Sequence, residues 1–425
     1  MSSATTSSGA TTSGSSSSQT TVNKKGNVAS FSHQVDTNLT AIDTYGNTFK
    51  VPDYSIKDIL SAIPAHCYER RLLQSFSYVF RDIFCMLTLG FIANNYIQLL
   101  PNVYLRGIAW AAYIWCQGLF GTGIWVMAHE CGHQAFSDYG WVNDLTGWVL
   151  HSYLLVPYFS WKFSHGKHHK ATGHITRDMV FVPKTKDQFL QARGAHDLED
   201  IVGDSPIYTL LQLIFQQTFG WISYLIANVS GQKYPGYNKF AVSHFNPNSP
   251  IFDKKDYWFV ILSDIGLLIQ STVLYNWYQT FGLFNITVNY LIPYFLVNHW
   301  LVFITFLQHS DPKMPHYEAH QWNFARGAAA TIDREFGFVG KHIFHDIIET
   351  HVLHHYVSRI PFYNAREASE AIKKVMGEHY QYSDENMWVS LWKSGRWCQY
   401  VDGDNGVLMY RNLNGFGVDP KKKTH

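Results

Sequence analysis

Residues 107–133 read GIAWAAYIWCQGLFGTGIWVMAHECGH and join a membrane-length apolar run to a metal-binding pattern. The run from Gly107 to Ala128 has no charged residue and can cross a bilayer core, which takes about 20 residues. It leads directly into His129 and His133, which are four residues apart and therefore share one helix face. Two such imidazoles can bind one metal ion, as in the H-E-x-x-H motif of zinc proteases. The stretch therefore predicts a transmembrane helix that ends either in a metal site or in two interfacial histidines, and the rest of the chain has to decide between them.

Further apolar runs define the fold class, which we predict to be an all-α integral membrane protein. Four transmembrane helices in two hairpins are expected, together with interfacial helices and a cytosolic, histidine-rich catalytic cap. The segment Leu145–Phe159 is too short to span and is assigned to the interface. Ile207–Ser230 contains several Gln and Asn residues, so we expect it to lie on the membrane surface rather than to cross. The four predicted spans lie near 83–100, 107–128, 257–281 and 284–308.

The distribution of basic residues sets the predicted orientation. Arg70, Arg71 and Arg81 precede the first span, and segment 231–256 contains four lysines. Cytosolic loops are enriched in Lys and Arg, so both regions are expected in the cytosol. Both termini and all histidine clusters then lie on the cytosolic side of a multi-pass protein.

Composition limits the remaining possibilities. The 425 residues carry a net charge of +1, which gives no electrostatic case for nucleic-acid binding. The five cysteines are scattered without a C-x-x-C pair, as expected in a reducing compartment. We divide the chain into a disordered Ser/Thr-rich N-terminus (1–40), a membrane domain (41–400) and a cytosolic C-terminal tail (401–425). Lys422 and Lys423 near the end resemble a dilysine signal for the endoplasmic reticulum.

Two further histidine clusters change the meaning of the H-E-x-x-H motif. HGKHH contains His165, His168 and His169, and HVLHH has the same spacing at 351, 354 and 355. Eight imidazoles exceed the needs of one metal ion, so two metals are inferred. Imidazole suits zinc, copper, iron and nickel alike. Iron is favoured because oxygen activation needs a redox metal and a membrane surface offers no polar substrate for hydrolysis.

These clusters resemble the three histidine boxes of the membrane fatty acid desaturases. The matching stretches are HECGHQAF, HGKHHKATGH and ETHVLHHYVSRIPFYNA, supported by TRDMVFVPK, LQHSDPKMPHY and ATIDREFGF. The resemblance covers roughly residues 40–400. It is strongest to the oleate (Δ12) and ω-3 (Δ15) desaturases of fungi and plants.

The resemblance implies a di-iron centre with O2 as cosubstrate. It implies His309 as an additional ligand, whereas His299 is assigned to packing. Acidic residues near the boxes are candidates to orient the ligands, because ligating histidines usually donate their second N–H to a carboxylate or carbonyl. These acids are Glu130, Asp178, Asp346 and Glu349. The implied iron ligands are His129, His133, His165, His168, His169, His351, His354, His355 and His309.

The resemblance also implies the partners and the location. No H-P-G-G stretch and no Gly-rich dinucleotide motif occur. Electrons should therefore come from separate cytochrome b5 and its reductase, at the endoplasmic reticulum membrane. The substrate is an acyl chain on a membrane lipid or on coenzyme A, and the oligomeric state stays open.

Several functions remain as alternatives. We favour Δ12 desaturation of oleoyl to linoleoyl chains, with ω-3/Δ15 desaturation of linoleoyl chains as the alternative. Hydroxylases and acetylenases share these boxes. From other classes, a zinc-dependent membrane hydrolase would use only H-E-x-x-H. A metal storage or transport protein would need polar groups along its spans, whereas the clusters lie outside them.

Overall fold

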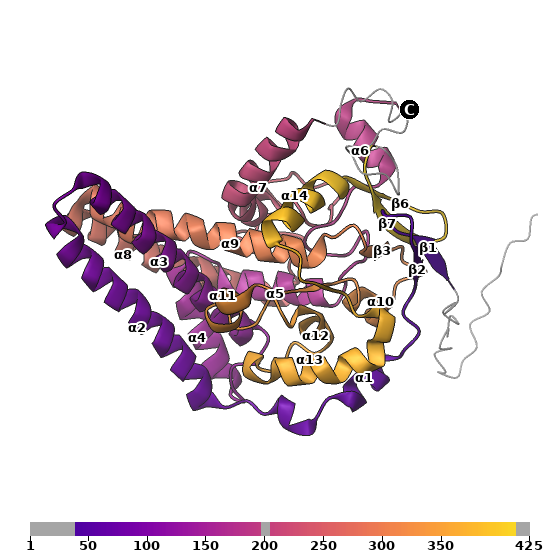
Figure 1. Cartoon of the computed structure of the whole chain (residues 1–425), viewed down its shortest axis with the longest axis horizontal. Coiled ribbons are helices and arrows are strands. Elements are labelled where there is room, and N and C mark those ends of the chain that lie inside the picture. The colour runs from indigo at the N-terminus through magenta and orange to yellow at the C-terminus, as the bar shows by residue number, and fades with distance from the viewer. Residues whose placement is uncertain (1–38, 197–204, 414–425) are drawn as a thin grey trace, which may run out of the picture. The chain divides into compact units, whose positions relative to one another are not determined.

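The computed structural model describes residues 39–196 and 205–413. Most of the predicted disordered N-terminus, and Lys422 and Lys423, lie outside the described residues. The described chain is mostly helical, as Figure 1 shows.

The first predicted hairpin consists of α2 (Leu72–Tyr96) and α3 (Val103–Gly132). A short 3-10 helix, Ile97–Leu99, follows α2. Asn102 begins α3, because its side-chain oxygen accepts a hydrogen bond from the Tyr104 N–H at 2.7 Å. The two helices pack along each other and bring the chain back to His129.

The second predicted hairpin turns at Gly282. Helix α8 (Tyr257–Ile286) is interrupted there, where φ is +79° and ψ is 173°, a conformation available essentially only to glycine. The chain continues through a π-helical turn, Thr287–Leu291, into α9 (Ile292–His309). The break falls in the predicted link between the third and fourth spans.

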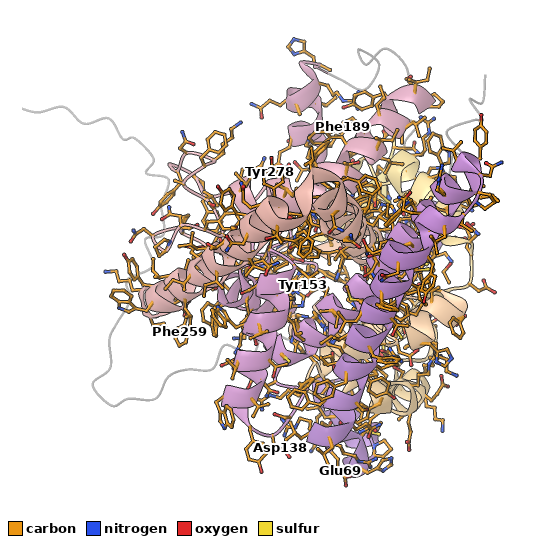
Figure 2. The ribbon with its side chains drawn as sticks, turned by 90° about the vertical axis from the view of Figure 1, so that its left-hand side faces the viewer. Glu69, Asp138, Tyr153, Phe189, Phe259 and Tyr278 are labelled. Atoms are coloured by element: carbon orange, nitrogen blue, oxygen red, sulfur yellow. The ribbon has the colours of Figure 1, made fainter. Side chains whose placement is uncertain are left out.

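Two helical segments among the described residues are long and apolar enough to cross a membrane. They are Leu72–Leu99 and Lys254–His309, and the second contains both the third and the fourth predicted spans. Helix α3, with the second predicted span, does not meet this test. The outer sides of α2 and α8 expose large apolar side chains such as Phe84 and Leu268, and Figure 2 shows Phe259 and Tyr278 along α8. These findings are compatible with membrane association.

The two hairpins are held together by close contact between α3 and α9. A Cβ atom at Gly118 would lie 2.6 Å from Leu296 Cβ, and one at Gly121 would lie 2.7 Å from Val297 Cγ2. Only glycine permits this approach of the two backbones. The contact places the ends of α3 and α9, with His129 and His309, in one buried region.

Shorter helices surround these ends. Helices α4 (Gly140–Tyr153), α5 (Tyr158–His169) and α7 (Pro206–Ala227) lie in the middle of the chain. Their packing, with α3 and α9, forms the largest apolar core. The remaining helices are α1 (Ile56–Ala62), α6 (Lys186–Arg193), α10 (Phe324–Ala328), α11 (Gly337–His342), α12 (His351–Tyr356), α13 (Phe362–Met376) and α14 (Met387–Trp397).

The prediction of an all-α chain was wrong for several short strands. The strands are β1 (Thr40–Ile42), β2 (Thr48–Lys50), β3 (Pro315–Tyr317), β4 (Asp333–Arg334), β5 (Tyr382–Ser383), β6 (Tyr400–Asp402) and β7 (Val407–Arg411). A three-stranded antiparallel sheet has the order β3-β7-β6, and its register pairs Pro315 with Met409 and Tyr400 with Arg411. The two-stranded pairs are β1-β2 and β4-β5.

The folded region extends beyond the boundary predicted at residue 400. Strands β6 and β7 form a hairpin that closes over Asn405–Gly406, a pair typical of hairpin turns. Val407 and Met409 are buried against Tyr317. The start of the segment predicted as a tail is therefore part of the core.

Candidate metal centre

Four helix ends carry the predicted histidine ligands to one place. His129 lies in the last turn of α3, and His133 follows it directly. Helix α5 ends in the second cluster, α9 ends at His309, and α12 begins at His351 and contains the third cluster.

The histidines form two groups, each with its candidate ligand atoms within 4.8 Å of one another. The larger group is His129, His133, His165, His169 and His354, and the smaller is His168, His309 and His355. His351 lies beside the smaller group, since its Nε2 lies 2.9 Å from Nε2 of His309. The structure thus brings all nine predicted histidines together, in two sets.

The ring nitrogens are arranged as metal ligands would be. His165 Nε2 lies 3.1 Å from Nε2 of both His129 and His169. Nitrogens about 2.1 Å from a shared metal and at right angles to each other would be about 3.0 Å apart. In addition, Nε2 of His133 and His354 is buried without a hydrogen-bond partner among the described residues. Buried polar atoms in proteins normally have a partner, and a metal ion bound to these two nitrogens would be that partner.

The electrostatics favour the neutral, metal-binding form of these imidazoles. Burial lowers the pKa of His354 to about 3, helped by the nearby His168. Burial also lowers the pKa of His133 and His165 well below the usual value, and neighbouring histidines add to the effect. These side chains are therefore neutral at pH 7 and have a free lone pair for a metal ion.

Two side chains orient histidines of the smaller group. Nδ1 of His168 lies 2.5 Å from Oδ1 of Asp178, which also accepts a hydrogen bond from the Met179 N–H at 2.7 Å. Nδ1 of His355 lies 3.1 Å from Oγ1 of Thr172, which itself donates to the His168 carbonyl. Each contact fixes one ring nitrogen and leaves Nε2 for a metal. Sequence reasoning missed Thr172, whose only signal is its place just after the second cluster.

The other three acidic residues expected to orient ligands have different contacts. Glu130 Oε1 is 3.7 Å from His129 Nδ1, and its Oε2 accepts a hydrogen bond from the Phe362 N–H at 3.2 Å. Burial raises the pKa of Glu130 to about 8. Asp346 pairs with Arg366, whose Nε lies 2.8 Å from Oδ1. Glu349 accepts a hydrogen bond from a backbone N–H, that of Phe336, at 3.2 Å.

His299 lies apart from both groups. Its ring packs against Trp388, with the ring centroids 5.8 Å apart. This contact agrees with its assignment to packing.

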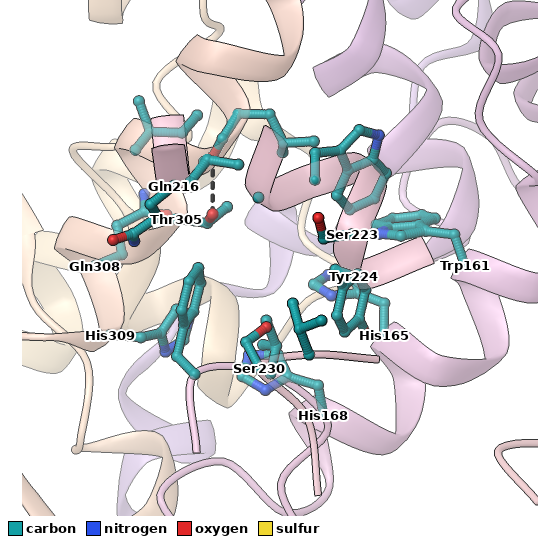
Figure 3. A pocket seen from close by; sticks show the side chains of 18 of the residues that line it. Trp161, His165, His168, Gln216, Ser223, Tyr224, Ser230, Thr305, Gln308 and His309 are labelled. Carbon is teal, nitrogen blue, oxygen red and sulfur yellow. Dashed lines mark hydrogen bonds between the residues drawn. The ribbon is translucent and has the colours of Figure 1, made fainter. Parts of the chain in front are cut away.

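An apolar cavity of about 430 Å³ lies beside the histidines. Trp125 of α3, Trp161 of α5 and Trp221 of α7 form part of its wall. Gln216 of α7 and Thr305 and Gln308 of α9 also line it (Figure 3). Trp125 and Trp161 each precede a box histidine by four residues, so they share its helix face, a signal that the sequence analysis overlooked. Five of the nine histidines also line the cavity, namely His129, His165, His168, His309 and His351.

Comparison with known proteins defines the class of this protein. Residues 108–385 match the family described as fatty acid desaturase. The chain belongs to the fatty acid desaturase family and is an oxidoreductase of lipid metabolism, which confirms the resemblance seen in the sequence.

Similar proteins include both desaturases and a hydroxylase. The chain is 49% identical to an oleate hydroxylase of Claviceps purpurea over 406 residues, 89% of this chain and 85% of the relative. It is 45% identical to a Delta(12) fatty acid desaturase of Mortierella isabellina, covering 86% of this chain and 93% of the relative. Identity to a Delta(12)-fatty-acid desaturase of Arabidopsis thaliana is 42%, over 85% and 92% of the two chains.

The zinc-hydrolase alternative gains no support. His129 and His133 share their group with three further imidazoles, whereas a catalytic zinc site keeps three protein ligands and an open position. Glu130, which would serve as general base in a hydrolase, accepts a hydrogen bond from the backbone of Phe362.

Proposed function

We propose that this protein is a di-iron, O2-dependent acyl-lipid desaturase that introduces a cis Δ12 double bond into oleoyl chains to give linoleoyl chains. The observation that carries the proposal is the apolar cavity of about 430 Å³, here called the acyl cavity, because histidines of both groups form part of its wall. An acyl chain in this cavity would pass directly beside two candidate metal positions. The similarity to the Delta(12) desaturases supports the regiochemistry.

The nine histidines would hold two irons. When bound, the irons would supply the oxidising power that removes one hydrogen from each of two adjacent methylenes, while O2 and two donor electrons, with two protons, end as two water molecules. Trp125, Trp161 and Trp221 bury the chain and keep bulk water out. Asp178 holds the ring of His168 in place.

Expression in a yeast that makes only monounsaturated lipids tests this function. We expect 18:2 with double bonds at carbons 9 and 12, measured by fatty-acid analysis, to appear in cells with the full-length chain and to be missing with empty vector. Product should also require the electron donor, which we propose to be cytochrome b5 with its reductase.

The same experiment separates the alternatives. The 49% identity to an oleate hydroxylase makes hydroxylation of oleate the second candidate, and hydroxylated oleate as the main product would replace the desaturase proposal. Formation of 18:3 from supplied linoleate, without 18:2 from oleate, would indicate an ω-3/Δ15 desaturase.

We further propose a four-span topology in the endoplasmic reticulum membrane, with both termini and the metal centre in the cytosol. The support is the position of the Gly282 break between the last two predicted spans and the lysines in segment 231–256. Helix α7 would then lie at the interface, consistent with its exposed Ile207, Leu211 and Ile214.

A glycosylation acceptor near Tyr237 tests this topology. We expect the acceptor to stay unmodified in microsomes, because a cytosolic segment is not reached by the lumenal transferase. An acceptor near Gly282 is the matched control and should be modified. Efficient glycosylation near Tyr237 would mean that α7 crosses the membrane, and the four-span arrangement would be wrong.

A further inference from the structure

A second cavity adjoins the acyl cavity and has a different character. It measures about 180 Å³ and is here called the basic cavity, because Lys184 and Arg193 form part of its wall. Gln212 of α7 lines both cavities, so the two cavities adjoin at this side chain. Ser205, Thr209 and Gln399 add polar groups to the wall of the basic cavity.

Lys184 and Arg193 are the two cations of the basic cavity. Among residues 39–196 and 205–413, no carboxylate lies within salt-bridge distance of Lys184 or Arg193. Burial and the nearby positive charges of Arg193 and Lys233 lower the pKa of Lys184, so this lysine faces like charge. The guanidinium of Arg193 is held over the ring of Tyr208, with its carbon 4.7 Å from the ring centroid. This concentration of positive charge suits an anionic ligand.

Helix α7 lies between the two cavities and an exposed apolar surface of the protein. Ile207, Leu211 and Ile214 are exposed, whereas Gln212 and Gln216 line the acyl cavity. The side chain of Phe215 lines the acyl cavity and is also 60% exposed. A ligand that reaches the acyl cavity past α7 would carry its apolar chain into the protein and leave its polar group at the helix surface.

We propose that the basic cavity binds the phosphate group of the acyl carrier while the acyl chain occupies the acyl cavity. This inference rests on the proposed function and adds to it the residues that would hold the phosphate of the acyl carrier, Lys184 and Arg193. The phosphate belongs either to a phospholipid or to acyl coenzyme A. Anchoring the phosphate at Lys184 and Arg193 fixes the depth to which the chain enters, and therefore which methylenes lie beside the metal centre.

The double substitution Lys184→Gln with Arg193→Gln tests this site in the purified, iron-loaded full-length protein with its donor system. Three oleoyl substrates are compared: palmitoyl-oleoyl phosphatidylcholine, oleoyl coenzyme A and dioleoylglycerol, which has no phosphate. We expect KM for the phosphate-bearing carrier to rise about ten- to hundredfold, as loss of charged hydrogen bonds implies, with kcat retained. KM for dioleoylglycerol should stay unchanged. The carrier on which KM rises identifies the source of the phosphate.

The matched control is Lys186→Gln with Lys313→Gln, which removes two exposed lysines outside the basic cavity. This control should behave as wild type with all three substrates. An unchanged KM for both phosphate-bearing carriers in the double variant, or an equal rise with dioleoylglycerol, would overturn the proposal.

A binding measurement keeps this test separate from that of the proposed function. Native mass spectrometry with distearoyl phosphatidylcholine, stearoyl coenzyme A and distearoylglycerol reports binding without turnover. Wild type should bind at least one of the two phosphate-bearing compounds more tightly than distearoylglycerol, and the double variant should lose this preference. Lack of product from every oleoyl substrate in wild type would contradict the proposed function, whereas equal binding of all three compounds by wild type would contradict the phosphate site.

Discussion

Replacement of His168 or His354 by alanine should reduce product formation below detection. Each substitution removes one ring from a different group of the metal centre. Loss of an outer-shell partner costs about 10- to 100-fold in metal affinity or activity, and loss of a ligand should cost more. Fatty-acid analysis measures the product, metal analysis of the purified variant measures iron, and immunoblotting shows that the protein is still in the membrane.

Two companion variants make this result specific. His320→Ala removes an exposed histidine outside both groups and should keep activity and iron content. Asp178→Asn weakens the contact with His168 but leaves every ligand in place, so it should lose about 10- to 100-fold. Full activity of His168→Ala or His354→Ala would remove that residue from the ligand set.

A phenylalanine at Gly220 should abolish activity by filling the acyl cavity. Gly220 lines this cavity on α7, and a Cβ atom there meets nothing closer than Gln216 Cγ at 3.6 Å, so the backbone accepts a side chain. The added ring would occupy space needed by the acyl chain. Displacing a substrate by about 1 Å can cost about 100-fold in rate, and blocking its path should cost at least that.

The control for Gly220→Phe is Ile214→Phe on the same helix. Ile214 is 53% exposed and does not line the acyl cavity, so its replacement should leave product formation near wild type. Both variants should retain their iron, because neither residue belongs to the histidine groups. Wild-type product formation by Gly220→Phe would show that the acyl chain does not occupy this cavity.

Local spacing was enough to select eight of the nine histidines that the structure brings together, whereas His309 was implied by the family resemblance. His129 and His133 share a helix face, and the two H-x-x-H-H clusters likewise occupy single helices, α5 and α12. Apolar runs similarly placed both hairpins, with a glycine break in the second predicted link. These features depend on residues that are near in sequence, which is why periodicity revealed them.

Features that depend on distant residues were not predictable in the same way. Asp346 bonds to Arg366, and Tyr54 bonds to Tyr356 with their hydroxyls 2.8 Å apart, because elements distant in sequence meet there. Several strands are only two or three residues long, too short to show an alternating pattern. The β6-β7 hairpin is different, since Asn405–Gly406 was a readable turn signal inside a segment assigned to the tail.

The close crossing of α3 and α9 has a consequence for how the protein is made. The larger histidine group needs His354 as well as His129, and the smaller one needs His355 as well as His168. A nascent chain therefore holds neither complete group until the ribosome has passed residue 355, when the first hairpin is already synthesised. The glycine contact at Gly118 and Gly121 gives the late hairpin a docking place on the early one. Completion of both histidine groups is thereby tied to synthesis of most of the chain, and a product truncated before residue 354 lacks one histidine of each group.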